Sequence, residues 1–176
     1  MSRTGSILLV ILLAFLPVFP GCARTAMQRL DEAPGARARL EALTETEYSM
    51  ISHAVEFLEL SDEVWALPDR KYYGQWLKGL EAEQSGDFDA AIRAYQEASQ
   101  IILYEVDNFE VLLPLGRVLM RDGLPGEARR ALTEFVGRAH AALAADGPVR
   151  YTEESAAEVE ETIAVAEWLL GYLEED

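Results

Sequence analysis

The strongest constraint on the fold is an internal repeat in the middle of the chain. Two stretches, residues 79–98 and 116–135, align without gaps at an offset of 37 residues. The matched pairs are Gly79 and Gly116, Gly86 and Gly123, Ala91 and Ala128, Tyr95 and Leu132, and Ala98 and Phe135. Chance agreement at so many small-residue positions is improbable, and a period of this length indicates a repeated supersecondary unit.

The glycines indicate that each unit is a helical hairpin. The first glycine of each copy, Gly79 or Gly116, is expected where the second helix approaches closely, since a side chain there would hold the two axes apart. The second glycine, seven residues later in both copies, suits a left-handed cap that ends the first helix. Asp87 and Pro125 then suit the start of the second helix. Small Ala91 and its counterpart are expected where that helix crosses back.

Helical spacing continues outside the repeat. Apolar residues at spacings of three, four and three occur at Tyr48, Ile51, Val55 and Leu58. Thr44 and Glu47 form a candidate capping box ahead of them. Further helices are expected over residues 68–85, 87–104, 109–122, 125–144 and 153–173. Sustained alternation typical of strands is absent from the sequence, so the predicted class is all-α with six or seven helices.

The two copies resemble the tetratricopeptide repeat, a helix–turn–helix unit of about 34 residues. The signature positions matched in the copy at 72–105 are Gly79, Gly86, Ala91, Tyr95 and Ala98; those in the copy at 109–142 are Leu112, Leu115, Gly116, Gly123 and Ala128. Phe135 stands where the family has alanine. The resemblance implies a short solenoid of helical hairpins spanning residues 36–176, with residues 153–173 as a capping helix.

In that family the first helix of each unit lines a concave groove that binds a peptide or a partner helix. Carried over by position, the groove would present Tyr73, Trp76, Leu80, Glu83, Gln84, Glu110, Leu113, Arg117, Met120 and Arg121. Aromatic residues and arginine are common at binding hot spots, and arginine can bind a carboxylate through two hydrogen bonds. An alternative is that Trp76 belongs to the core and that both arginines pair with acidic side chains of the same chain.

The N-terminus predicts export. Arg3 precedes thirteen apolar residues, 7–19, too few to cross a bilayer as a helix and typical of a signal peptide. Gly21 and Cys22 resemble the end of the bacterial lipoprotein signal, although Phe19 and Pro20 depart from it. This resemblance implies a signal peptide at 1–21, acylation (palmitate included) of Cys22, and a tether at 22–35. Secretion with cleavage after Ala23 is an alternative.

Charge and rare residues exclude several functions. The net charge is −16, so the surface repels phosphate backbones and binding to nucleic acid is not expected. Cys22 is the single cysteine, and His53 and His140 are the two histidines, so neither a metal site nor another cofactor is predicted. No motif for hydrolysis, phosphate binding or metal-dependent catalysis occurs, and an enzyme is not expected.

The sequence therefore predicts a protein–protein interaction module anchored to the cell envelope by lipid alone. Its partner would be another envelope protein or peptide, bound in the helical groove by an adaptor or assembly factor. Because Ala23 is not the aspartate associated with inner-membrane retention, the resemblance favours the periplasmic face of the outer membrane. The alternative is a periplasmic component that binds a small ligand between repeats, with Tyr73 and Trp76 as walls.

Overall fold

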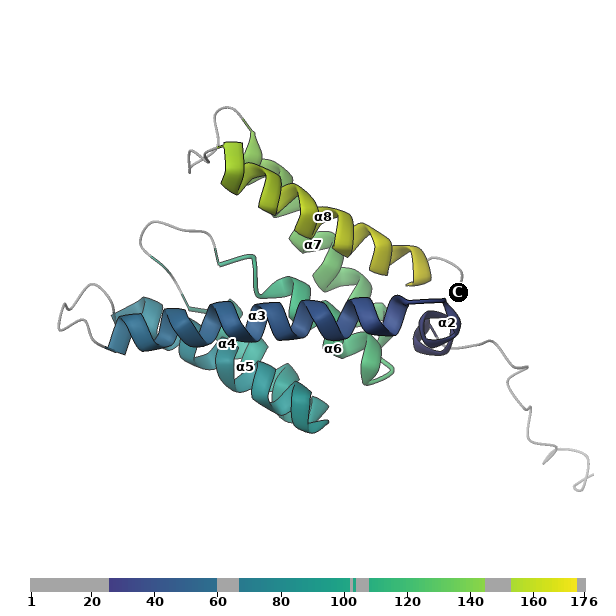
Figure 1. The fold of residues 1–176 in the computed structure, drawn as a ribbon, viewed down its shortest axis with the longest axis horizontal. Coiled ribbons are helices and arrows are strands. Elements are labelled where there is room, and N and C mark those ends of the chain that lie inside the picture. The colour runs from purple at the N-terminus through teal and green to yellow at the C-terminus, as the bar shows by residue number, and fades with distance from the viewer. Residues whose placement is uncertain (1–25, 60–66, 102, 104–107, 145–152, 174–176) are drawn as a thin grey trace, which may run out of the picture.

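The chain folds into packed helices (Figure 1). The computed structural model describes residues 26–59, 67–101, 103, 108–144 and 153–173. These residues form seven helices and no strand: α2 (Ala26–Glu32), α3 (Ala36–Glu59), α4 (Leu67–Ser85), α5 (Phe88–Ser99), α6 (Leu112–Arg121), α7 (Pro125–Leu143) and α8 (Glu153–Leu173). The all-α prediction is confirmed. None of these helices is both long enough and apolar enough to span a bilayer. The predicted signal peptide and Cys22 lie outside the described residues.

Each copy of the repeat is a helical hairpin, α4 with α5 and α6 with α7. A methyl group added to Gly79 would lie 2.3 Å from Cε1 of the Tyr95 ring, and one added to Gly116 would lie 2.5 Å from Cγ of Leu132. The expected close approach is therefore confirmed in both hairpins, against the two residues that are equivalent in the repeat. Ala91 is fully buried at the crossing.

The turns within the two hairpins also follow the sequence. Gly86 and Gly123 both have positive φ angles, a left-handed conformation that glycine adopts without strain. The Asp87 carboxylate accepts a hydrogen bond from the amide of Ala90 at 3.0 Å and so caps α5. Pro125 begins α7, where its missing N–H group leaves no bond unmade.

The predicted start of the helix that contains Tyr48 and Leu58 is wrong. Thr44 is not a cap, because α3 begins eight residues earlier, at Ala36. The Thr44 hydroxyl instead donates to the carbonyl of Leu40, one turn back in the same helix, at 2.9 Å. The buried residues Ala36 and Leu40 continue the apolar stripe toward the N-terminus at a spacing of four, and this extends the helix.

The predicted tether at 22–35 is corrected over the residues that the structure describes. Residues 26–32 form α2, and Leu30 is fully buried, so this segment belongs to the packed domain. Arg29 Nη2 donates to the carbonyl oxygen of Tyr172 at 2.6 Å, which joins α2 to α8. The guanidinium carbon of Arg39 lies 4.6 Å from the centre of the Trp168 ring, a cation–π contact between α3 and α8.

Successive helices from α3 to α8 pack on one another, and α6 lies at the centre. Every residue from Val111 to Met120 is buried, because α6 is flanked by α5 and α7 and also contacts α2 and α8. A helix apolar on all sides needs such surroundings. Since α2 contacts both α3 and α8, it lies between the first and the last helix of this series. The extended solenoid stays a prediction.

Candidate functional site

The structure places most of the predicted groove residues inside the protein. The buried ones are Trp76, Leu80, Glu83, Leu113, Arg117 and Met120. Tyr73 and Glu110 are half-buried, Gln84 is exposed, and the Arg121 side chain is one-fifth exposed. The Tyr73 and Trp76 rings are nearly parallel, with centres 6.3 Å apart. Trp76 and Arg117 therefore agree with the alternative in which they serve the fold.

Part of this burial comes from α3, which the repeat pattern does not include. This long helix crosses in front of α4 and α6 (Figure 1) and packs against α4. It also reaches α6, since Glu47 of α3 accepts hydrogen bonds from Nη1 and Nη2 of Arg117 at 3.1 and 2.8 Å. The leading helices of the two hairpins are thus partly covered by a helix of the same chain.

Glu83 is the centre of a buried polar cluster that joins the two hairpins. Its oxygens accept hydrogen bonds from Nε and Nη2 of Arg117, both at 2.8 Å. Arg121 Nη1 donates to Oε1 at 2.9 Å, and the Tyr95 hydroxyl donates to Oε2 at 3.0 Å. With Glu47 the cluster holds two carboxylates and two guanidinium groups, so its formal charge is zero. Charge-assisted bonds of this kind hold side chains in one arrangement.

The electrostatics of the cluster keep Glu83 ionised. Burial alone would raise the pKa of Glu83, but the adjacent charges of Arg117 and Arg121 outweigh it and hold the pKa below its ordinary value. Burial raises the pKa of Tyr95, as does the neighbouring Glu83 carboxylate, so the phenol stays protonated and donates its hydrogen bond. Glu110 lacks such compensation, and burial raises its pKa.

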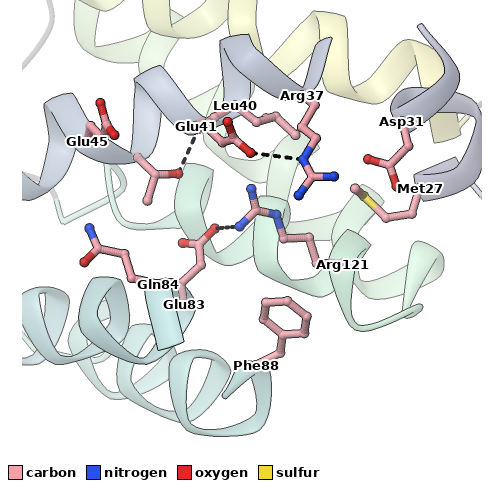
Figure 2. A pocket seen from close by; sticks show the side chains of 11 residues that line it. Met27, Asp31, Arg37, Leu40, Glu41, Glu45, Glu83, Gln84, Phe88 and Arg121 are labelled. Carbon is pink, nitrogen blue, oxygen red and sulfur yellow. Dashed lines mark hydrogen bonds and ion pairs between the residues drawn. The ribbon is translucent and has the colours of Figure 1, made fainter. Parts of the chain in front are cut away.

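A cleft of about 690 Å³ opens beside this cluster (Figure 2). Five helices line it: Met27 and Asp31 come from α2; Arg37, Leu40, Glu41, Thr44 and Glu45 from α3; Glu83 and Gln84 from α4; Phe88 from α5; and Arg121 from α6. The half-buried side chains of Met27 and Phe88 supply its accessible apolar surface, since Leu40 is only 2% exposed. Glu83 and Arg121 form one wall, and their ion pair ties that wall to the buried cluster. The shape of the wall is therefore set before anything binds.

Only Glu83, Gln84 and Arg121 of the predicted groove residues line this cleft. The sequence interpretation missed its other residues because most lie on α2 and α3, before the repeat begins. One signal was present. Ala36, Leu40 and Thr44 are spaced four residues apart, and Tyr48 follows at the same spacing. This pattern would have extended the predicted helix toward the N-terminus, to Ala36.

No family model, no curated protein and no solved structure matches this chain. The site is therefore characterised by its geometry. Within the described residues no three or more histidine, cysteine or acidic side chains are grouped to hold a metal ion. Both histidines are exposed, and one ring nitrogen of His53 lies 2.6 Å from the carbonyl oxygen of Ser49 in its own helix. The cleft, with its mixed apolar and charged lining, is the candidate functional site.

Proposed function

We propose that this chain is a lipid-anchored protein-interaction module of the cell envelope, an adaptor or assembly factor, and that it receives a segment of its partner in the cleft. The observation that carries this proposal is a cleft of about 690 Å³ with one wall braced by buried ion pairs. A site held in shape before binding loses less conformational entropy when a partner docks. The half-buried apolar side chains Met27 and Phe88 offer contact area, and the surrounding polar groups would orient the occupant.

Site-directed photocrosslinking in producing cells tests this role. A photoreactive amino acid at Gln84, exposed in the cleft, is expected to give one discrete protein adduct, because the occupant lies within reach of this side chain. The matched control is Thr133, an exposed position on α7 that does not line the cleft. It should give no such band. Equal adducts from both positions would mean that the cleft has no special role.

A small ligand is the second candidate, since the volume of the cleft falls within the range common for ligand pockets. It replaces the first if Gln84 gives no protein adduct while small organic acids raise the melting temperature of the purified protein. An increase of several degrees at millimolar ligand that is lost in an Arg121→Gln variant would place that ligand in the cleft.

The membrane anchor has its own test. Changing Cys22 to alanine is expected to move the protein from the membrane fraction to the soluble fraction, because acyl chains on this sulfur would hold it there. Labelled palmitate should enter the unaltered protein and not the variant. Mass spectrometry of the mature N-terminus distinguishes a chain that begins with acylated Cys22 from an unacylated chain cleaved after Ala23. Unchanged membrane retention of the variant would contradict the anchor, and the density of the membranes shows whether they are outer membranes.

A further inference from the structure

The charges of the cleft are unbalanced, and the imbalance indicates what kind of segment fits. Four carboxylates and two guanidinium groups line it: Asp31, Glu41, Glu45, Glu83, Arg37 and Arg121. Both guanidinium groups are engaged within the chain, Arg37 with Glu41 at 3.0 Å and Arg121 with Glu83 at 2.9 Å. Asp31 and Glu45 have no ion-pair partner among the residues that the structure describes. The cleft therefore carries a formal charge of about −2 at neutral pH.

The pairing of Arg121 with Glu83 is expected to persist when a partner binds, so the charge of the cleft stays negative. Arg121 is held by a carboxylate whose side chain is fully buried, and Glu83 in turn is shared with Arg117. Withdrawing Arg121 to bind an incoming carboxylate would weaken the neutralisation of Glu83 inside the protein, which is costly. An acidic segment would also face Asp31 and Glu45, so it is disfavoured twice.

The two carboxylates that have no ion-pair partner in the described part of the chain lie at opposite ends of the cleft. Figure 2 shows Asp31 beside Met27 at one end and Glu45 at the other, with Leu40 between them on the same side. The lining part of α3 runs from Arg37 to Glu45. At the rise of an α-helix these eight steps span about two turns. An occupant can therefore meet an acidic group at each end and apolar side chains in between.

We infer that the cleft takes a short basic amphipathic segment of the partner protein, with apolar residues flanked on each side by a lysine or arginine. The inference rests on the proposed interaction role and specifies the chemistry of the partner. The apolar residues contact Met27 and Phe88, and the cations pair with Asp31 and Glu45. The net charge of −16 on the chain also speeds the approach of a basic segment.

A synthetic peptide tests this chemistry on the full chain. The probe is a fluorescein-labelled 15-residue peptide of alanine and glutamine with leucine at positions 7 and 8 and lysine at positions 4 and 11. Its counterpart carries glutamate in place of both lysines. Fluorescence anisotropy at low salt is expected to show at least tenfold tighter binding of the lysine peptide, since surface charge pairs are least screened there.

Matched variants distinguish binding in the cleft from attraction by the net negative charge of the chain. Asp31→Asn combined with Glu45→Gln should weaken binding of the lysine peptide by roughly fivefold, as expected for two partly exposed charge pairs. Glu158→Gln combined with Glu160→Gln removes the same charge from exposed positions on α8 and should change binding less than twofold. Circular dichroism melting confirms that all variants are folded. The inference is overturned if both pairs weaken binding equally, if the glutamate peptide binds as well, or if neither peptide binds.

The two proposals fail in different ways. A protein adduct from Gln84 whose yield does not fall in the Asp31→Asn, Glu45→Gln variant would keep the interaction role and reject a basic partner. Absence of an adduct from Gln84 together with absence of peptide binding would reject both. Loss of the adduct in this variant, with the adduct kept in the α8 variant, supports both.

Discussion

Replacing Glu83 with alanine is expected to lower the free energy of unfolding by about 3–5 kcal/mol, the usual cost of removing one partner from a buried ion pair. The change leaves Arg117, which is 2% exposed, with only Glu47 as a counter-charge, and it leaves the buried Tyr95 hydroxyl without its acceptor. Urea unfolding of the unlipidated chain at pH 7, followed by circular dichroism, measures the loss.

Two controls make this result specific. Glu81→Ala removes an exposed carboxylate two residues away on the same helix and should alter the free energy by less than about 0.5 kcal/mol. Replacing both members of the pair, Glu83 by leucine and Arg117 by methionine, should recover part of the loss, because the most deeply buried charge, that of Arg117, is then removed. The recovery is incomplete, since Glu47 and Arg121 lose their partners. A loss below about 1 kcal/mol for Glu83→Ala would show that the pair contributes little.

The effect of Glu83→Ala also depends on pH. Because the folded protein lowers the pKa of Glu83, the stability it contributes is fully present above its unfolded pKa, near 4.5, and is lost as pH falls through the lower folded value. The difference in the free energy of unfolding between the unaltered protein and the variant should therefore be constant from pH 6 to 8 and become smaller in acid.

Changing Gly79 to alanine is expected to destabilise the protein by about 1–3 kcal/mol through overpacking. The new methyl group would lie 2.3–2.8 Å from three atoms of the Tyr95 ring. That ring is fully buried, and its hydroxyl is bonded to Glu83, so it has little freedom to move away. The loss exceeds the gain of about 1 kcal/mol that alanine brings to a helix interior. Thermal and urea unfolding measure the net change.

Gly74 is the matched control for this substitution. It lies in the same helix, α4, and a methyl group added there would meet no atom within 4 Å. Gly74→Ala should therefore stabilise the protein by about 0.5–1 kcal/mol, since only helix propensity changes. Opposite signs at Gly74 and Gly79 are the expected result. Stabilisation at both positions would show that the hairpin axes can move apart at little cost.

Local chemistry explains why the hairpins were predictable. Gly86 and Gly123 specify left-handed caps through a backbone conformation that most other residues avoid, and this preference acts within a few residues. Gly79 faces Tyr95 only sixteen positions later, across a single turn, and the same distance separates Gly116 from Leu132. These contacts are short in sequence and occur twice, so alignment of the two copies reveals them.

The location of the candidate site was not predictable in the same way. Arg117 pairs with Glu47 across 70 positions, and Arg29 reaches the carbonyl of Tyr172 across 143 positions. Neither contact can be recognised from the spacing of residues in the sequence. An arginine occupies the same position in the helical pattern whether it faces a partner or a carboxylate of its own chain. Resemblance by position therefore led to a groove over α4 and α6, while the packing of α3 leaves the cleft beside it.

Local sequence was enough to specify the all-α class, the two hairpins and the residues of their turns, because backbone conformation and the size of neighbouring side chains decide these features locally. The tertiary structure alone decided that α3 crosses the leading helices, that Arg117 is buried against Glu83 and Glu47, and that an acidic cleft opens beside them. Long-range packing decided these features, since it is the meeting of distant helices that removes some charges from water and leaves Asp31 and Glu45 facing the cleft.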